Sequence, residues 1–183
     1  MPPSDASPPS LRSVRSQVSL QVRGTEPSDL SALLAAERAP ENAPYVGQWA
    51  PERHRANLED ANYLYLTLRH GADAAAAFCG YVILEGLAEG QQSVNLKRLV
   101  VTDKRRGLGR AAVRHVMRLA FEELGAHRLW LDVKTGNAPA RSLYESEGFR
   151  LEGTLRDCLR RGDAYESLHV LSLLRPEYEA RRC

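Results

Sequence analysis

The chain has 183 residues, of which 43% are hydrophobic and 26% are charged, and its formal net charge is +2. This length suits one domain around a single buried core, and this composition excludes a disordered or membrane-embedded chain. No apolar run approaches the ~20 residues that span a bilayer, no secretory signal opens the chain, and the net charge is small, so we expect a cytoplasmic location with no membrane or nucleic-acid partner.

The chain is expected to fold as one domain between two tails. Residues 1–16 are rich in Pro and Ser and predict a flexible tail. The domain is expected at 17–178, with a short C-terminal tail at 179–183. A chain of this size has room for one active site.

The first elements of the domain are predicted to be a strand and two helices. Alternating apolar residues predict a strand at 18–22. A capping hydroxyl and acidic residues at 25–29 predict the start of a helix that ends near Ala39. A loop at 42–50 then leads to a short, strongly charged helix at 51–60.

Three strands are predicted next, at 63–70, 76–84 and 93–101. A turn at 71–73 joins the first two as a hairpin, and a Gly-containing link at 86–90 precedes the third. The third strand ends in an unbroken apolar run, which implies burial on both faces.

A long amphipathic helix is the most regular feature of the chain. Its apolar residues recur at helical spacing. They are Val113, Val116, Met117, Ala120, Phe121 and Leu124. Gly125 supplies the stop that is expected at the end of such a helix.

The last third of the chain predicts a strand, a helix and a hairpin. The strand lies at 128–133, and the helix at 137–147 is closed by Gly148. Two strands at 149–159 and 164–174 form the hairpin. The order of elements along the chain predicts a mixed α/β fold around one sheet.

A basic, glycine-punctuated turn connects the third strand of the middle group to the long helix. Its residues are Lys104, Arg105, Arg106, Gly107, Leu108, Gly109 and Arg110. Such a turn presents backbone N–H groups at the positive end of a helix dipole, and glycine lets the main chain approach a phosphate. The turn is therefore a candidate anion site. The alternative is a tight turn with solvated basic side chains.

A second motif follows the strand at 128–133. It reads Asn137-Ala138-Pro139-Ala140-Arg141-Ser142-Leu143-Tyr144-Glu145-Ser146-Glu147-Gly148-Phe149 and resembles a hallmark of the GNAT superfamily, the Gcn5-related N-acetyltransferases. The basic turn resembles that superfamily's cofactor motif, (Gln or Arg)-x-x-Gly-x-(Gly or Ala). The chain departs from it at Lys104, where Gln or Arg is usual, and at Arg105, where Gly is common.

The resemblance implies a fold, a reaction and a donor. The fold would be a single, mostly antiparallel sheet flanked by helices, with a splayed central strand pair. The reaction would transfer an acetyl group from acetyl-CoA, as co-substrate, to a primary amine by direct attack, without a metal. Dimers are common in the family, so a homodimer is a further expectation.

The resemblance also assigns residues to the cofactor. The phosphates would be held at 104–110. The pantetheine arm would pair with backbone groups in the splay, at Leu99, Val100 and Val101. Asn137 would hydrogen-bond this arm, and Arg141 would lie near the cofactor.

Tyr144 is the expected general acid, which would protonate the departing thiolate, since a phenol suits such a leaving group. The alternative is that Tyr144 packs with Leu143 and Phe149 as ordinary core. The general base is left open between Glu85, at the end of the strand before 93–101, and a water relay.

The acceptor amine is the part of the reaction that the sequence defines least. Residues 148–156 and 162–166 resemble the branch with acetyltransferases of ribosomal-protein N-termini and of diamines. Many members of that branch carry Tyr-x-Asp where this chain has Tyr165-Glu166-Ser167. Tyr45, Trp49 and the hairpin tip at 160–163 occupy segments that border the acceptor pocket in relatives; packing and solvated-turn roles are the alternatives.

Two other function classes fit parts of the sequence. Residues 107–112 satisfy GxGxxA and Asp132 follows, as in a dinucleotide-binding oxidoreductase, but the strand does not meet Gly107 tightly and too little chain remains for a doubly wound sheet. A non-catalytic acyl-CoA sensor or interaction module is also compatible with the cofactor motif.

Cysteine and histidine spacing gives no metal signal. Cys79, Cys158 and Cys183 form no CxxC pair and are interpreted as structural thiols. The five histidines contain no HxxxH spacing, which favours surface or core roles over metal ligation. No GxSxG elbow is present, so hydrolase chemistry of that type is excluded.

Overall fold

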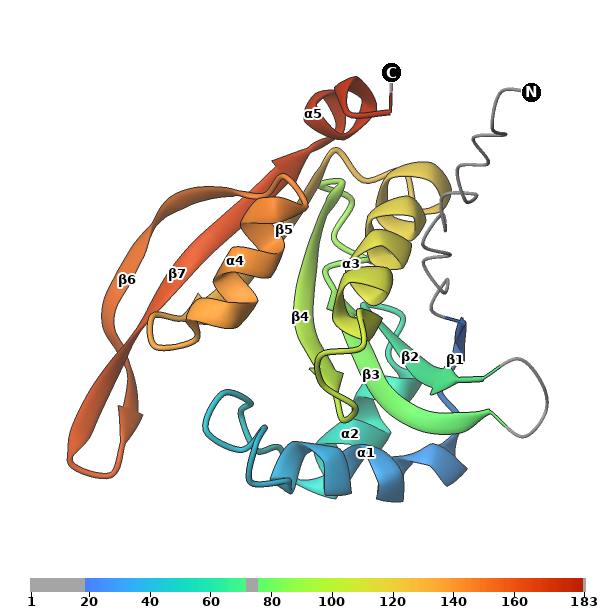
Figure 1. Ribbon diagram of the computed structural model, residues 1–183, viewed down its shortest axis with the longest axis vertical. Coiled ribbons are helices and arrows are strands. Elements are labelled where there is room, and N and C mark those ends of the chain that lie inside the picture. The colour runs from blue at the N-terminus through green and yellow to red at the C-terminus, as the bar shows by residue number, and fades with distance from the viewer. Residues whose placement is uncertain (1–18, 72–75, 183) are drawn as a thin grey trace, which may run out of the picture.

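The computed structural model describes residues 19–71 and 76–182 (Figure 1). The strands are β1 (Leu20–Gly24), β2 (Tyr63–His70), β3 (Ala77–Glu85), β4 (Ser93–Val101), β5 (Arg128–Lys134), β6 (Arg150–Arg161) and β7 (Ala164–Leu174). The helices are η1 (Pro27–Asp29), α1 (Leu30–Arg38), α2 (Pro51–Glu59), α3 (Leu108–Arg118), η2 (Leu119–Glu123), α4 (Ala138–Ser146) and α5 (Arg175–Ala180). The expected tail at 1–16, Cys183 and part of the turn at 71–73 lie outside the described residues.

The strands form one seven-stranded sheet in the order β1-β2-β3-β4-β5-β7-β6. Among the strands that the structure describes, β4 and β5 are the only parallel neighbours, and all other adjacent pairs are antiparallel. This arrangement confirms the mixed, mostly antiparallel single sheet. It differs from the doubly wound parallel sheet that a dinucleotide-binding fold requires.

The central pair, β4 and β5, separates along its length. The two strands pair only where Ser93–Asn95 faces Arg128–Trp130, although they continue to Val101 and Lys134. In β4 the register with β3 shifts at Lys97, which is a bulge that bends the strand. The predicted splay is therefore present, and it leaves the β5-facing backbone of the second half of β4 without a strand partner.

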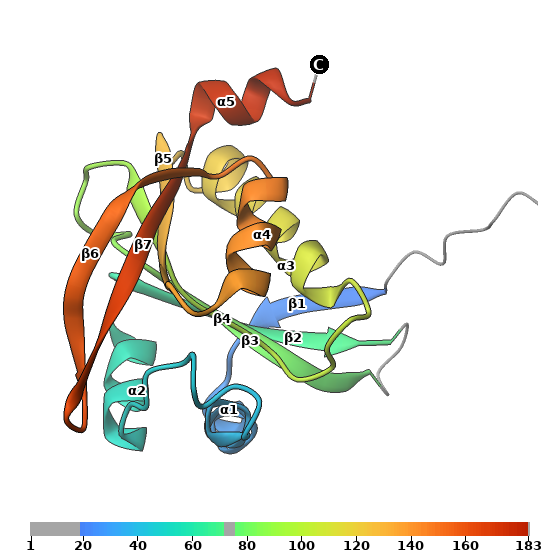
Figure 2. The ribbon, with the colours of Figure 1, turned by 60° about the vertical axis from the view of Figure 1, so that its left-hand side comes forward.

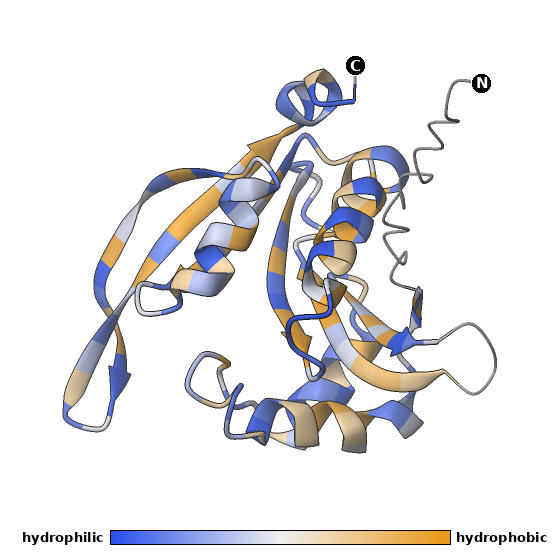
Figure 3. Cartoon of the chain, in the orientation of Figure 1, coloured by the Kyte–Doolittle hydropathy of each residue, from blue (hydrophilic) through white to orange (hydrophobic). Residues whose placement is uncertain are grey.

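Helices cover both faces of the sheet (Figure 2): α1 and α2 lie on one face, and α3 and α4 on the other. Alternate residues of the central strands serve the two layers, since Tyr81 and Ile83 belong to the cluster with α1, and Val82 and Leu84 to the cluster with α3. Hydrophobic and hydrophilic bands alternate along α3 (Figure 3), as its predicted amphipathicity requires. Within the described ranges, no helix is long and apolar enough to cross a membrane.

The N-terminal helix starts differently from the prediction. A short 3-10 turn, η1, precedes α1, and the Thr25 hydroxyl lies 3.0 Å from the Thr67 hydroxyl instead of capping the helix. Asp29 has a tertiary role, because it accepts hydrogen bonds from Arg23 at 2.7 and 2.8 Å. Sequence signals for helix caps are local, and this polar cluster forms only when β1 and β2 meet.

The end of the domain contains a helix that the sequence pattern did not reveal. The six-residue α5 is too short to show an apolar period. It is held in place by Tyr178, whose ring stacks on Phe121 at 4.8 Å and whose hydroxyl donates to Glu122 at 2.5 Å. The long central helix also ends in a π turn, η2, one turn before Gly125.

Candidate active site

A cleft of about 550 Å³ opens where β4 and β5 separate. Its walls come from β4, β5, α4, the loop between α1 and α2, and the β6–β7 hairpin. The volume is within the range of small-molecule sites. Five segments that are distant in the sequence therefore enclose one cavity.

The cleft brings together residues that the sequence had selected from separate motifs. They are Leu99 and Val100 of β4, Asn137 and Tyr144 at α4, Tyr45 and Trp49 of the loop, and Arg160 and Arg161 of the hairpin. Val101 lies at the buried end of β4 and packs in the core. The basic turn at 104–110 and Arg141 do not contribute to the cleft lining among the described residues.

The basic turn has the backbone geometry of an anion site. Arg105 and Gly107 have positive φ angles of 64° and 77°, and Gly107 is the N-cap of α3. The first helical hydrogen bond runs from Ala111 N to Gly107 O at 3.0 Å, so the amides of residues 108–110 lack helical acceptors. A left-handed residue explains why Gly is common at the position of Arg105, since only Gly adopts that conformation without cost.

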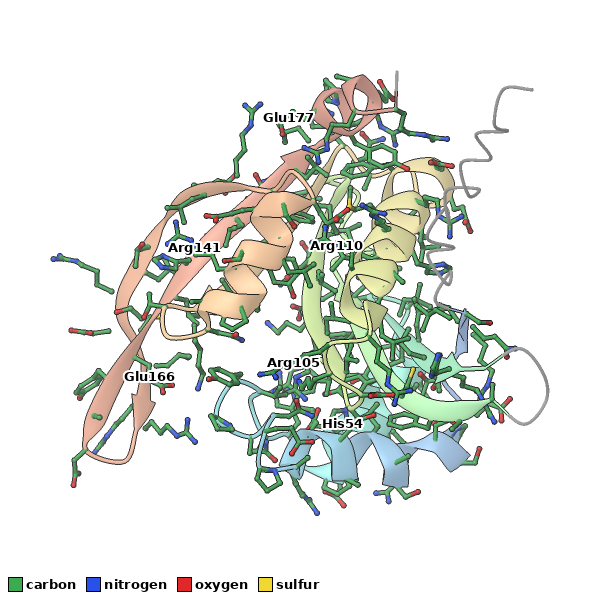
Figure 4. All side chains as sticks on the ribbon, in the orientation of Figure 1. His54, Arg105, Arg110, Arg141, Glu166 and Glu177 are labelled. Atoms are coloured by element: carbon green, nitrogen blue, oxygen red, sulfur yellow. The ribbon has the colours of Figure 1, made fainter. Side chains whose placement is uncertain are left out.

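Most basic side chains near this turn already have protein partners. Figure 4 labels Arg105 and Arg110 of the turn and Arg141 of α4. Lys104 Nζ donates to Asn42 at 2.5 Å, and burial lowers the pKa of this lysine. Arg106 pairs with Asp103 at 3.1 Å, and Arg110 with Glu147. Arg141 pairs with Glu145 at 2.8 Å and lies 3.1 Å from His169. Backbone amides therefore contribute more to an anion site here than lysine and arginine side chains do.

The position of Tyr144 is compatible with both roles that the sequence left open, a general acid and an ordinary core residue. Its ring is buried and lies edge-on to Phe149 at 5.7 Å, as a core residue would. It also lines the cleft, and its hydroxyl makes no hydrogen bond within the described part of the chain. Burial, and then the negative charge of Asp132, raise the pKa of Tyr144 above its ordinary value, which keeps the phenol protonated at neutral pH.

Asp132 also lines the cleft. Sequence analysis gave this residue a role only in the alternative of a dinucleotide-binding oxidoreductase. It lies on β5, where Leu129, Leu131 and Val133 face the core. The alternation along the strand therefore turns Asp132 to the opposite face. This alternation is the sequence signal that could have identified Asp132 as a cleft residue. Asp132 is exposed to the cleft, but the protein surrounding its carboxyl group removes part of the solvent, and although Lys97 opposes the effect, the pKa of Asp132 is raised.

Glu85, one of the two candidates for general base, is held by other side chains. It accepts hydrogen bonds from Tyr63 at 2.6 Å and Asn95 at 3.4 Å, and it pairs with Lys97 at 3.1 Å. Burial raises its pKa, but the Tyr63 and Lys97 contacts outweigh burial and hold the pKa of Glu85 below its ordinary value. Glu85 is also absent from the described lining of the cleft.

A buried polar cluster supports the wall on the α1 side. Glu37 is 1% exposed and accepts hydrogen bonds from Arg98 and, at 2.6 Å, from Tyr81. His54 Nε2 lies 3.3 Å from the same carboxylate oxygen. Burial alone would raise the pKa of Glu37, but His54, Tyr81 and Arg98 together lower it further than burial raises it. The sequence gave no sign of this cluster, because its members come from α1, α2, β3 and β4.

Metal ligation has no support among the side chains that the structure describes. No group of three or more His, Cys, Asp or Glu residues within 19–71 and 76–182 could hold a metal ion. Cys79 is a buried free thiol whose pKa is raised by burial to about 11, and Cys158 is an exposed free thiol.

Comparisons with known proteins agree with this geometry. The model of the acetyltransferase (GNAT) family matches residues 31–149. The ribosomal protein bS18 alanine N-acetyltransferase of Escherichia coli is 31% identical over 137 residues, which cover 74% of this chain and 83% of that protein. Streptothricin acetyltransferase of Streptomyces lavendulae is 36% identical over 100 residues, which cover 51% of this chain and 52% of that protein.

Solved structures have the same fold. The spermidine N-acetyltransferase of Vibrio cholerae in complex with CoA and spermine superimposes with a TM-score of 0.77 at 20% identity, covering 87% of this chain and 98% of that chain. Together with the family match over residues 31–149, these findings place the chain in the GNAT family of acetyltransferases.

Proposed function

We propose that this N-acetyltransferase joins its two substrates in the cleft between β4 and β5. The observation that carries the proposal is the splay itself: β4 and β5 part after Asn95 and Trp130, and Tyr144, Asn137 and Asp132 line the opening. Bound acetyl-CoA supplies a thioester whose carbonyl carbon can accept an amine. The backbone of β4 beyond Asn95 has no partner on its β5 side, which suits an extended arm that pairs like a strand.

The donor is proposed to bind across the β4–α3 turn and the splay. The amides at 107–110 would hold phosphate, and Arg105, which is exposed, would add charge. The remaining residues proposed for the donor are Leu99, Val100, Val101, Lys104, Arg106 and Arg141. Lys104 would have to exchange its bond to Asn42 for a phosphate.

The chain's own residues can manage the protons of the reaction. Asp132 is proposed to take a proton from the ammonium form of the acceptor, because its raised pKa makes it a stronger base than an ordinary aspartate. The amine nitrogen then forms a bond to the carbonyl carbon, the carbon–sulfur bond breaks, and the second proton that the nitrogen loses on becoming an amide replaces, directly or through water, the proton that Tyr144 gives up. Tyr144 is proposed to donate its proton to the leaving sulfur, and β4 amides would stabilise the charge on the carbonyl oxygen.

Three wider expectations remain proposals. A water relay is a second route for the base, with Asp132 as its end point. A homodimer is proposed because dimers are common in the family. Free thiols at Cys79 and Cys158 suit a reducing compartment, and the cytoplasm is the proposed location.

The function is tested by measuring CoA release with primary amines, and this also separates an enzyme from a non-catalytic acyl-CoA sensor. Wild-type protein is expected to release CoA only when an amine is present. Asp132→Asn is expected to lower kcat/KM roughly 10²-fold or more with an amine that is protonated at neutral pH. An amine that is already neutral at that pH does not need Asp132 to become a nucleophile, so its rate should fall far less.

The control for this variant is Asp157→Asn, which changes a carboxylate on the exposed strand β6. Binding of acetyl-CoA without CoA release in any amine would favour the sensor. An equal loss of rate for protonated and neutral amines in Asp132→Asn would remove Asp132 from the role of base.

A further inference from the structure

One wall of the cleft contains a buried guanidinium with unused donors. Arg98 of β4 lines the cleft and is 7% exposed. Its Nη1 donates to Glu37, and its guanidinium stacks on Trp49, with Cζ 3.8 Å from the ring centroid. Nη2 lies beneath the loop at Gly47, 3.4 Å from where a Cβ would stand, and makes no hydrogen bond among the described residues. A guanidinium has five N–H donors, and the contacts with Glu37 and Tyr81 leave donors of Arg98 free for an acceptor bound in the cleft.

The charges around the cleft leave one carboxylate available for an ammonium group. Glu166 is shared by Lys134 at 2.6 Å and Arg161 at 3.5 Å. Glu37 forms an ion pair with Arg98, and Glu85 forms an ion pair with Lys97. Asp132 forms no ion pair in the described part of the chain. A polyamine would need several such sites, whereas a single amine needs only Asp132.

Positive charge exceeds negative charge around the same cavity. Five cationic side chains line it, namely Lys97, Arg98, Lys134, Arg160 and Arg161, against two carboxylates, Asp132 and Glu166. Counting Glu37 and Glu85, which pair with two of these cations, leaves five positive and four negative groups. Arg160 donates to the backbone oxygen of Gly162 and has no carboxylate partner in the described residues.

We infer that the acceptor is a primary amine that also carries a carboxylate, and that Arg98 binds this carboxylate. The inference rests on the proposed function of the cleft. A guanidinium meets a carboxylate through two parallel N–H groups, which no ammonium side chain can match. Glu37 and Trp49 hold the guanidinium plane in place, so Arg98 enters the cleft already oriented. Asp132 faces the amine, and Arg98 faces the acid.

The test compares acceptors that differ only in charge. One pair is 4-aminobutanoate and its amide, and a second pair is the peptides Ala-Asp and Ala-Asn with amidated C-termini; spermidine is the polycationic arm. CoA release is measured, and kcat/KM is expected to favour each carboxylate over its neutral partner about 10- to 100-fold. The pair that turns over faster identifies a free amino acid or a peptide as the source of the carboxylate.

Variants assign the preference to Arg98. Arg98→Lys keeps the charge but loses the two-pronged donor, so the preference for the carboxylate should fall toward one, mainly through KM. The double variant Arg98→Gln/Glu37→Gln removes both members of the buried pair, avoids an isolated buried charge and should give the same result. Arg55→Lys, on the exposed face of α2, is the matched control and should retain the preference.

Two outcomes overturn the inference and can be told apart. Turnover of amines with no preference for the carboxylate, or with spermidine preferred, overturns it while leaving acetyl transfer in place. The absence of CoA release with every amine tested overturns it together with the proposed function. Retention of the preference in Arg98→Lys and in the double variant would remove Arg98 from the role.

Discussion

Tyr144 shows how one residue can serve packing and chemistry together. Its ring contributes to the core through Phe149, while its hydroxyl remains available to the cleft. Because burial raises the pKa of Tyr144, the phenol stays protonated across the neutral range and can donate to a thiolate. The raised pKa alone therefore keeps the phenol protonated, and no neighbouring acid is needed for this.

Removing the hydroxyl should separate these two roles. Tyr144→Phe keeps the ring and its packing, so the affinity for acetyl-CoA should be nearly unchanged, while kcat should fall roughly 10²-fold if the phenol acts as general acid. Steady-state kinetics and calorimetric titration with CoA measure the two effects. Tyr178→Phe, which removes a part-buried hydroxyl bonded to Glu122 and outside the cleft lining, is the matched control. Equal kcat in wild type and Tyr144→Phe would exclude the acid role.

Glu37 is the residue whose loss should cost most stability without touching the reacting atoms. Its carboxylate balances Arg98 in a buried site. Glu37→Gln leaves the guanidinium without its counter-charge and should lower the free energy of unfolding by about 3–5 kcal/mol. Glu52→Gln, on the exposed face of α2, should change it little. Urea titration measures both variants.

The pH dependence of that difference follows from the direction of the shift. The pKa of Glu37 in the folded chain lies below its ordinary value of 4.5. The stability that Glu37 contributes is therefore present above pH 4.5 and is lost as the pH falls through the folded pKa. Wild type and Glu37→Gln should converge in acid. A gap that widened below pH 4.5 would contradict this account.

At the scale of elements, α4 links the fold to the cleft through its first turn. The Asn137 side chain caps this helix by accepting from Ala140 N at 3.3 Å, and the same residue lines the cleft. The side-chain amide nitrogen of Asn137 is therefore free to donate a hydrogen bond to bound acetyl-CoA. Gly109 allows the neighbouring helix to approach, since a Cβ there would stand 3.4 Å from Leu143.

Two substitutions at Asn137 should separate its role as the cap of α4 from its proposed role in binding acetyl-CoA. Asn137→Ala loses the cap and should destabilise the domain by about 1 kcal/mol, and it also removes the donor contact. Asn137→Ser keeps a capping oxygen but has no amide N–H, so stability should be retained while the Kd for CoA rises. Thermal melts and titration calorimetry separate the two. If both variants bound CoA as wild type does, Asn137 would be only a cap.

At the scale of the whole molecule, the sheet consists of two halves joined by a short parallel contact. The pairs Ser93–Arg128, Val94–Leu129 and Asn95–Trp130 are the register between β4 and β5. On the far side of the cleft, Lys134 and Arg161 both donate to Pro44 O, at 2.8 and 3.0 Å, and so connect the hairpin to the loop after α1. A ligand in the splay would add contacts to both halves.

Acetyl-CoA should consequently stabilise the folded chain. At 100 times Kd, a ligand selective for the native state adds about 2.7 kcal/mol, which corresponds to a rise in Tm of roughly 5–10 °C for a chain of this size. Differential scanning fluorimetry measures it. NADH at the same concentration is the control, because a dinucleotide should give no comparable shift. A Tm unchanged by saturating acetyl-CoA would count against the donor site.

The sequence by itself determined the strands, the longer helices and the donor motif, but not the short helix α5. The period of α3, the apolar end of β4 and the turn at 104–110 are local patterns, and they fix where a strand passes into a helix with free amides. The second motif placed Asn137 and Tyr144 in one helix for the same reason. Even the splay followed from likeness to a family rather than from any residue pattern in β4 or β5.

Only the tertiary structure decided which side chains line the cleft that is proposed for the acceptor. Asp132 and Arg98 are 34 positions apart in the sequence and become part of one cleft because β4 and β5 separate beyond Asn95. Glu85, selected by its position at a strand end, is held by Tyr63 and Lys97 instead. Local periodicity reports which face a residue occupies, but charge pairing depends on neighbours brought together by the sheet, so the donor can be inferred from the sequence and the acceptor site only from the fold.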